Sequence, residues 1–186
     1  MLNWHRFLLR VNKMSYHGVL KQTDIFYEFS PQQLEQIASI CDERLFGMGD
    51  MIFDENTTGD ELYIIAHGEV EILVDPALVS DRPDTPSQPT TIATLRRGQS
   101  FGEIALVDRG LRSAGARSAS TETQLLIIPR EKLRTLCDSD PALGYRLMRN
   151  LATDLAMKIR NTDLLMREKL LYESVSRSGS NQQLDE

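Results

Sequence analysis

Residues 98–119, GQSFGEIALVDRGLRSAGARSA, constrain this chain more than any other stretch. Glu103 follows directly after Gly102, and Arg112 comes nine residues after Glu103. A carboxylate accepts hydrogen bonds from vicinal hydroxyls, whereas a guanidinium offers a fork of donors that matches phosphate oxygens. Glycine lets the backbone approach a ligand closely, and a helical turn that starts at Ile104 would point free N–H groups at an anion. The stretch therefore predicts a pocket for a ligand that carries both hydroxyls and an anion.

The segment contains, in order, Phe101, Gly102, Glu103, Ile104, Ala105, Arg112, Ser113 and Ala114. These eight residues, called the cassette below, resemble the phosphate-binding cassette of the cyclic nucleotide-binding domain family. That family includes bacterial catabolite activator proteins, regulatory subunits of protein kinase A and cyclic nucleotide-gated channels. The resemblance implies that Glu103 holds the ribose 2′-hydroxyl and that Arg112 pairs with the cyclic phosphate of cAMP or cGMP. It also implies that Ser113 and the backbone N–H groups of Gly102 and Ala105 complete the phosphate site.

The surroundings of the cassette depart from the family pattern. Leu111 stands where the family commonly has proline, and Gly and Ala at 115–116 replace the usual Thr or Ser. A rival arginine, Arg117, lies five residues after Arg112. On a strand that starts at Arg112, Arg117 has the opposite side-chain parity and should point away, so the prediction for the anion site stays with Arg112. A strand–turn–strand with a solvated Glu103 and Arg112 remains the structural alternative.

The composition is that of a globular protein, with 186 residues of which 41% are hydrophobic and 26% charged. The net charge is −6, and no cluster of Lys and Arg dominates a predicted face, so we expect no direct nucleic-acid partner. Neither a nucleophile–base pairing nor metal-ligand spacing is found, so we expect no enzyme and no metal. No apolar run reaches the ~18 residues of a membrane span, and no signal peptide is recognisable. We therefore expect a cytoplasmic protein, with Cys41 and Cys137 as reduced core thiols.

Three segments are predicted along the chain: a basic helix or tail over 1–18, a domain over 19–172 and a disordered tail over 173–186. Whether segment 1–14 docks on a partner or on its own domain is left open. Helices are predicted over 19–45, because Ser30 and Pro31 form a helix start. After them, Leu34 and Ile37 begin an apolar series with helical spacing.

Short strands punctuated by glycines are predicted over 46–129. The strands 62–65 and 70–74 flank a short turn and predict a hairpin, and further strands are expected at 50–53, 91–95, 114–120 and 123–128. The glycine frame over 49–72 resembles the family's β-roll, with Asn56 where many members carry glycine; asparagine also tolerates the left-handed conformation. Residues 75–90 hold four prolines and predict a loop within the roll, either a solvated insertion or a contact for the pocket or a partner.

Helices return over 131–172. Asp140 and Pro141 form the start of a long helix, whose seam of mostly apolar residues recurs at alternating spacings of four and three. The seam consists of Met148, Ala152, Leu155, Ile159, Thr162 and Met166. It either packs on the roll or forms a homodimer through 142–172, and the resemblance implies that such a helix both caps the base and makes the dimer. Base contacts are expected from Lys158, Asn161 or Thr162.

The sequence thus predicts an α+β, mainly β fold: an antiparallel, jelly-roll-like β-roll flanked by N-terminal helices and a long C-terminal capping helix. Too few residues follow that helix for a further domain, so we expect either a stand-alone regulatory module or a piece of a larger protein, and the start methionine and the polar end favour the former. We expect it to bind a cyclic nucleotide, cAMP rather than cGMP, and to transmit occupancy through the helix to an unidentified effector protein. The alternative is a degenerate domain that serves as a protein-interaction or structural module and binds no nucleotide.

Overall fold

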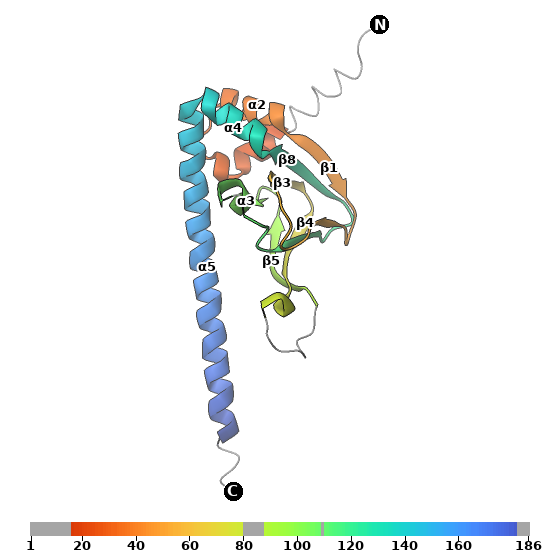
Figure 1. Cartoon of the computed structure of the whole chain (residues 1–186), viewed down its shortest axis with the longest axis vertical. Coiled ribbons are helices and arrows are strands. Elements are labelled where there is room, and N and C mark those ends of the chain that lie inside the picture. The colour runs from red at the N-terminus through yellow and green to blue at the C-terminus, as the bar shows by residue number, and fades with distance from the viewer. Residues whose placement is uncertain (1–15, 80–87, 109, 182–186) are drawn as a thin grey trace.

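The computed structural model describes residues 16–79, 88–108 and 110–181. A β-roll lies beside a group of helices, and the long helix α5 (Pro141–Asn181) passes along one side of the roll and extends well beyond it (Figure 1). The fold predicted from the sequence is confirmed, since two antiparallel sheets are flanked by N-terminal helices and by a long C-terminal helix. The predicted basic segment 1–18 lies outside the described residues up to position 15.

The N-terminal helices begin with a helical stretch over 16–22, followed by the 3-10 helix η1 (Asp24–Phe26) and by α2 (Pro31–Ile40). The predicted start at Ser30 is confirmed. The Ser30 hydroxyl accepts from the Gln33 N–H, and the Gln33 side chain accepts from the Ser30 N–H, so two of the free N–H groups at the helix start are satisfied.

Within the described residues, eight strands form two four-stranded sheets in which every neighbouring pair is antiparallel. The first sheet contains, in spatial order, β1 (Asp42–Phe46), β8 (Thr123–Pro129), β3 (Glu61–His67) and β6 (Ser100–Phe101). The second contains β2 (Met51–Phe53), β7 (Gly115–Ser118), β4 (Glu69–Val74) and β5 (Thr90–Arg96). The apolar residues between the sheets include Tyr63, Ile65, Phe101 and Leu125.

The predicted hairpin over 62–74 is wrong. β3 and β4 belong to different sheets, and a single residue, Gly68, connects them. Gly68 has φ +81, and a Cβ there would lie 2.6 Å from the Glu122 carbonyl oxygen. One glycine is too short for a hairpin loop but suffices for a corner, so the chain crosses from one sheet to the other at this point.

The predicted helical range 19–45 is also corrected at its end, because residues 42–46 form β1. This strand, DERLF, is mostly charged and lies at a sheet edge, so its sequence carries little of the apolar alternation that marks a strand. Its position depends on pairing with β8, which lies 77 or more residues later in the chain (Phe46 with Thr123). Of the predicted loop over 75–90, residues 76–79 form the 3-10 helix η2 (Pro76–Val79), and 80–87 lie outside the described residues.

The C-terminal helices are α4 (Arg130–Ser139) and α5. The predicted start of the long helix is confirmed: Pro141 is its first residue, and the Asp140 carboxylate accepts from the Leu143 N–H at 3.0 Å. The helix continues to Asn181, so residues 173–181 are helical and not a disordered tail as predicted from their polar composition. Extending an existing helix fixes one residue for each added hydrogen bond, which costs far less than starting one.

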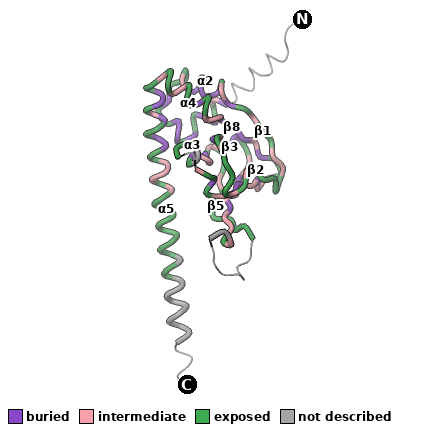
Figure 2. The backbone as a smooth tube through the Cα atoms, in the orientation of Figure 1, coloured by how far each residue is buried: buried purple, intermediate pink, exposed green. Residues whose placement is uncertain are grey.

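Helix α5 is buried only near its start. Leu143, Leu147 and Leu151 pack against the N-terminal helices and α4, in a core that includes Leu20 and Ile37. Figure 2 shows buried positions on the first turns of α5 and exposed positions further along. No helix among the described residues is long and apolar enough to cross a membrane.

Candidate functional site

The cassette starts where β6 turns into the short helix α3 (Glu103–Asp108), with Gly102 between them. Gly102 has φ +81, and a Cβ at this position would lie 2.6 Å from Arg112 Nη1 and 3.1 Å from the Glu61 carbonyl oxygen. Both the backbone conformation and the space therefore require glycine. The arginine nine residues after Glu103 thus folds back onto the start of the cassette.

Arg112 is buried, with 4% of its surface exposed. Nη1 donates to the Gly102 carbonyl oxygen at 2.9 Å, and Nη2 donates to the Glu61 carbonyl oxygen at 3.0 Å. Nε is buried and has no hydrogen-bond partner among the described residues. Its backbone is also fixed, because Arg112 N–H donates to the Thr57 carbonyl at 2.8 Å. The Arg112 side chain is therefore held in one position, and its Nε–H remains free to donate to a ligand.

Two aromatic rings and a glycine surround the guanidinium. Its central carbon lies 4.3 Å from the centroid of Phe53 and 5.4 Å from that of Tyr63, a favourable arrangement for a cation. A Cβ at Gly59 would lie 2.1 Å from Arg112 Nε, so this glycine makes the room that the side chain occupies. In the sequence, Gly59 falls within the glycine frame of the roll, and neither it nor Phe53 or Tyr63 was predicted to belong to the site. No sequence pattern links these three residues to Arg112, because they lie about 50 residues before it in the chain.

Glu103 is buried, with 5% exposed, and it meets a side chain from α5. Lys158 Nζ donates to Glu103 Oε1 at 2.8 Å and to the Ser100 carbonyl oxygen at 3.3 Å. Lys158 Nζ also lies 2.8 Å from Asp154 Oδ2, one turn earlier on the same helix. Burial alone would lower the pKa of Lys158, but the carboxylates of Glu103 and Asp154 together raise it above its ordinary value.

The other cassette residues are distributed between core and surface. Phe101 is buried between the sheets, where its ring stacks on Tyr63 with centroids 5.0 Å apart, so its side chain serves packing. Ile104 and Ser113 are exposed, and Ala114 is half-buried. Ala105 lies within α3, but its side chain is outside the described residues.

The rival arginine is engaged elsewhere. Arg117 Nη2 lies 2.7 Å from Glu71 Oε2, its cross-strand neighbour on β4. Arg112 instead contacts Gly102 and Glu61. The parity argument from the sequence does not apply, because β7 begins at Gly115 and Arg112 lies before the strand; the two arginines nonetheless have different partners. Of the expected base contacts, Asn161 and Thr162 are exposed on α5, and Lys158 is bound to Glu103.

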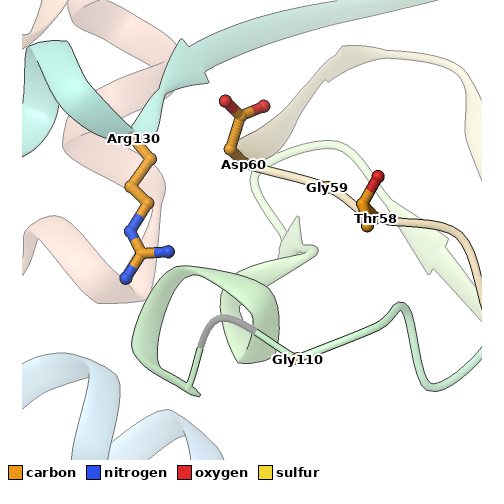
Figure 3. Close-up of a pocket in the computed structure, with 5 residues that line it drawn as sticks. All are labelled: Thr58, Gly59, Asp60, Gly110 and Arg130. Atoms are coloured by element: carbon orange, nitrogen blue, oxygen red, sulfur yellow. The ribbon is translucent and has the colours of Figure 1, made fainter.

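A shallow hollow of about 320 Å³ lies next to the cassette, lined by Thr58, Gly59, Asp60, Gly110 and Arg130. In Figure 3 the Arg130 side chain points toward α3, and the Asp60 carboxylate points away from the loop that carries Thr58. Gly59 belongs both to this hollow and to the wall behind Arg112. Neither Glu103 nor Arg112 lines it, so the chemistry of the site lies beside the hollow and not within it.

Comparison with known proteins identifies the family. Residues 43–140, more than half of the chain, match the model of the cyclic nucleotide-binding domain. The cyclic AMP receptor protein of Thermus thermophilus is 32% identical over 145 residues, which cover 78% of this chain and 61% of that protein. Human cGMP-dependent protein kinase 2 is 28% identical over 116 residues, 62% of this chain and 14% of the kinase.

Solved structures agree with the match. The crystal structure of the Thermus thermophilus catabolite activator protein superposes with a TM-score of 0.64 at 31% identity, covering 78% of this chain and 62% of that one. The chain thus spans less than two thirds of the length of these relatives. The matched range 43–140 contains the whole cassette with Glu103 and Arg112, and the chain belongs to the cyclic nucleotide-binding domain family.

Proposed function

We propose that this chain is a regulatory module that binds a cyclic nucleotide, with the cyclic phosphate on Arg112 and the ribose 2′-hydroxyl on Glu103. The observation that carries the proposal is the state of Arg112. Its guanidinium is buried, bound to two carbonyl oxygens, and keeps an unpaired Nε. Among the described residues, the acidic side chains form their ion pairs with other cations and not with Arg112.

A buried cation without an anion is costly, because its desolvation is not repaid. A phosphate supplies the missing charge and accepts the remaining guanidinium donors. Ser113, next to Arg112, and the N–H groups of Gly102 and Ala105 complete the proposed phosphate site. Ile104 and Ala114 are the neighbouring cassette residues in this assignment.

The ligand in this proposal is cAMP. The support is the 32% identity to a protein named as a cyclic AMP receptor, against 28% to a cGMP-dependent kinase. Ser113 is compatible with either purine. The module is proposed to be non-catalytic and cytoplasmic, and to report occupancy through α5 to an effector protein.

We also propose that α5 forms a homodimer. The seam predicted from the sequence is mostly exposed: Met148, Ile159 and Met166 are 47%, 63% and 62% exposed, and Leu155 is half-buried. Such a stripe on a projecting helix is the kind of surface that a second copy buries. Sedimentation velocity tests this, with Ile159→Glu expected to give monomer and the neighbouring exposed Arg160→Glu expected to remain dimeric. A monomeric wild-type chain would overturn the dimer and leave the nucleotide site unaffected.

The alternative function is a protein-interaction or structural module that binds no nucleotide. One observation favours it: the carboxylate of Glu103 already has a cationic partner in Lys158. Leu111 is exposed, and Ala116 is fully buried in β7, so the departures from the family pattern lie beside the arginine and not in its contacts.

Thermal unfolding in the presence of cAMP, cGMP or cyclic di-GMP separates the two functions. A ligand at about 100 times its Kd stabilises the folded state by about 2.7 kcal/mol, which corresponds to a rise in Tm of about 5–10 °C for a chain of this size. We expect that rise with cAMP and a smaller one with cGMP. Unchanged melting curves with all three nucleotides would refute the proposed function and leave the alternative.

A further inference from the structure

Helix α5 reaches the cassette through Lys158. Among the described residues, the other hydrogen bonds and ion pairs between α5 and the body of the protein are made near the start of α5, to the N-terminal helical segment. They are Arg146 with Gln33, Arg149 with Glu28, and Asn150 with the carbonyls of Ile25 and Tyr27. Beyond Lys158, each described side chain of α5 up to Leu171 is exposed. Within the described part of the chain, Lys158 is thus where the projecting half of α5 is fastened to the roll.

The atom that Lys158 holds is one that the proposed nucleotide needs. Glu103 Oε1 accepts from Lys158 Nζ at 2.8 Å, and Glu103 is buried with 5% of its surface exposed, so the space around it is restricted. We propose that Lys158 is a latch that competes with the ribose 2′-hydroxyl for Glu103, so that nucleotide binding releases α5 from the cassette. This inference rests on the proposed function, because it assigns Glu103 to the ribose.

Asp154 makes the release of Lys158 inexpensive. Its Oδ2 lies 2.8 Å from Lys158 Nζ, and positions four residues apart share one helix face. When the nucleotide takes Glu103, the ammonium keeps Asp154 as its counter-charge and is not stranded. The Lys158 side chain is also 38% exposed, so water can solvate the freed ammonium. Two carboxylates on one lysine, one on the roll and one on the helix, are the arrangement that an exchange of partners requires.

The latch makes a prediction opposite to that of a base contact, the role that the sequence analysis expected of Lys158. If the ammonium competes with the ligand, Lys158→Met tightens cAMP binding to the full chain by about 2- to 5-fold, the range for losing a partly solvated ion pair. Asp154→Asn leaves Glu103 as the one carboxylate that contacts Lys158 among the described residues and weakens binding by about 2- to 5-fold. Lys132→Met is the matched control, because Lys132 pairs with the exposed Asp42 at 3.3 Å and is on α4.

The ligand itself supplies a second control. 2′-Deoxy-cAMP lacks the hydroxyl that competes for Glu103, so Lys158→Met is expected to leave its affinity unchanged. Isothermal titration calorimetry of the wild type, the three variants and both ligands measures these effects. Tightening of cAMP but not of the deoxy ligand supports the latch, as does cAMP binding by Lys158→Met where the wild type has none.

The failing outcomes are distinct. Equal or weaker binding of cAMP to Lys158→Met, with normal binding by the wild type, overturns the latch and leaves the proposed function standing. No binding by either protein overturns the proposed function and the latch with it. A measurement without ligand tests whether Lys158 fastens the helix. Amide hydrogen exchange over 150–171 is expected to be faster in Lys158→Met than in the wild type and in Lys132→Met. Equal exchange in all three proteins would show that Lys158 does not fasten the helix.

Discussion

Replacing Arg112 by alanine tests the core of the proposed site. The guanidinium makes two hydrogen bonds within the protein, at 2.9 and 3.0 Å, and both go to backbone carbonyl oxygens. A bound phosphate would be its first anionic partner among the groups that the structure describes. Removing one member of such a buried charge pair costs ~2–5 kcal/mol of binding free energy. We therefore expect the Kd for cAMP to rise by about 30- to 5000-fold.

Without ligand the same substitution is expected to change stability much less. The two carbonyls lose charge-assisted hydrogen bonds worth about 1.5–3 kcal/mol each. The variant also relieves the burial of a cation that lacks a counter-ion, a cost of several kcal/mol. These opposing effects leave a net change in the free energy of unfolding of about 2 kcal/mol or less. A large loss of affinity with a small loss of stability would mark Arg112 as a binding residue.

Calorimetry with cAMP and urea unfolding without it measure the two quantities. Arg117→Ala is the matched control, since Arg117 is five residues away and pairs with the partly exposed Glu71; it is expected to cost under about 1 kcal/mol of stability and no affinity. Wild-type affinity in Arg112→Ala would refute the assignment of the phosphate site. Strong destabilisation without any ligand would refute the argument that the guanidinium lacks a partner.

Further predictions follow from single contacts. In Gly59→Ala, the new Cβ 2.1 Å from Arg112 Nε displaces the guanidinium, so calorimetry should show cAMP affinity reduced by about 1–3 kcal/mol; Gly18→Ala, with open space around its Cβ, should bind normally. Asn150→Ala strands the Ile25 and Tyr27 carbonyls and should lower the free energy of unfolding by about 1–3 kcal/mol in urea, whereas wild-type stability would contradict this. The hydrogen bond from the Leu143 N–H lowers the pKa of Asp140 below its ordinary value; stability from this cap is therefore fully present above the unfolded pKa and is lost as the pH falls through the lower folded pKa. Asp140→Asn should flatten that acid-side loss in pH-dependent unfolding, and an unchanged profile would contradict it.

The parts of the fold that the sequence predicted well are those decided by local chemistry. Ser30 with Pro31 and Asp140 with Pro141 mark helix starts because capping involves only residues within one turn. The strand positions were also largely recovered, because alternation and glycines are local signals. The pairing of strands was not. β3 and β4 are adjacent in the chain but lie in different sheets, and only the single-residue connection at Gly68 hinted at it.

In the cassette, too, the features set by nearby residues were predictable and those set by distant residues were not. The spacing of Glu103 and Arg112 was enough to nominate both side chains, and the structure brings Arg112 to the carbonyl of the residue before Glu103. The wall around Arg112 was not predictable, because Gly59 and Phe53 reach it from strands and turns far away in the sequence. Phe101 illustrates the reverse case. A motif residue was taken as a ligand contact, although its side chain packs between the sheets.

Helix α5 carries two stripes, and the sequence identified only one. The seam that includes Ile159 and Met166 is exposed, whereas Leu147, Leu151, Asp154 and Lys158, spaced four, three and four residues apart, face the rest of the protein. The second stripe ends in polar residues, so no apolar pattern marks it. A helix with one stripe on the cassette and another exposed can couple the two surfaces, but only as far as the nucleotide favours the released helix over the fastened one. The exchange of Lys158 between Glu103 and Asp154 keeps that difference small, and a change of 2- to 5-fold in affinity on removing Lys158, about 0.4–1.0 kcal/mol, would be its measure.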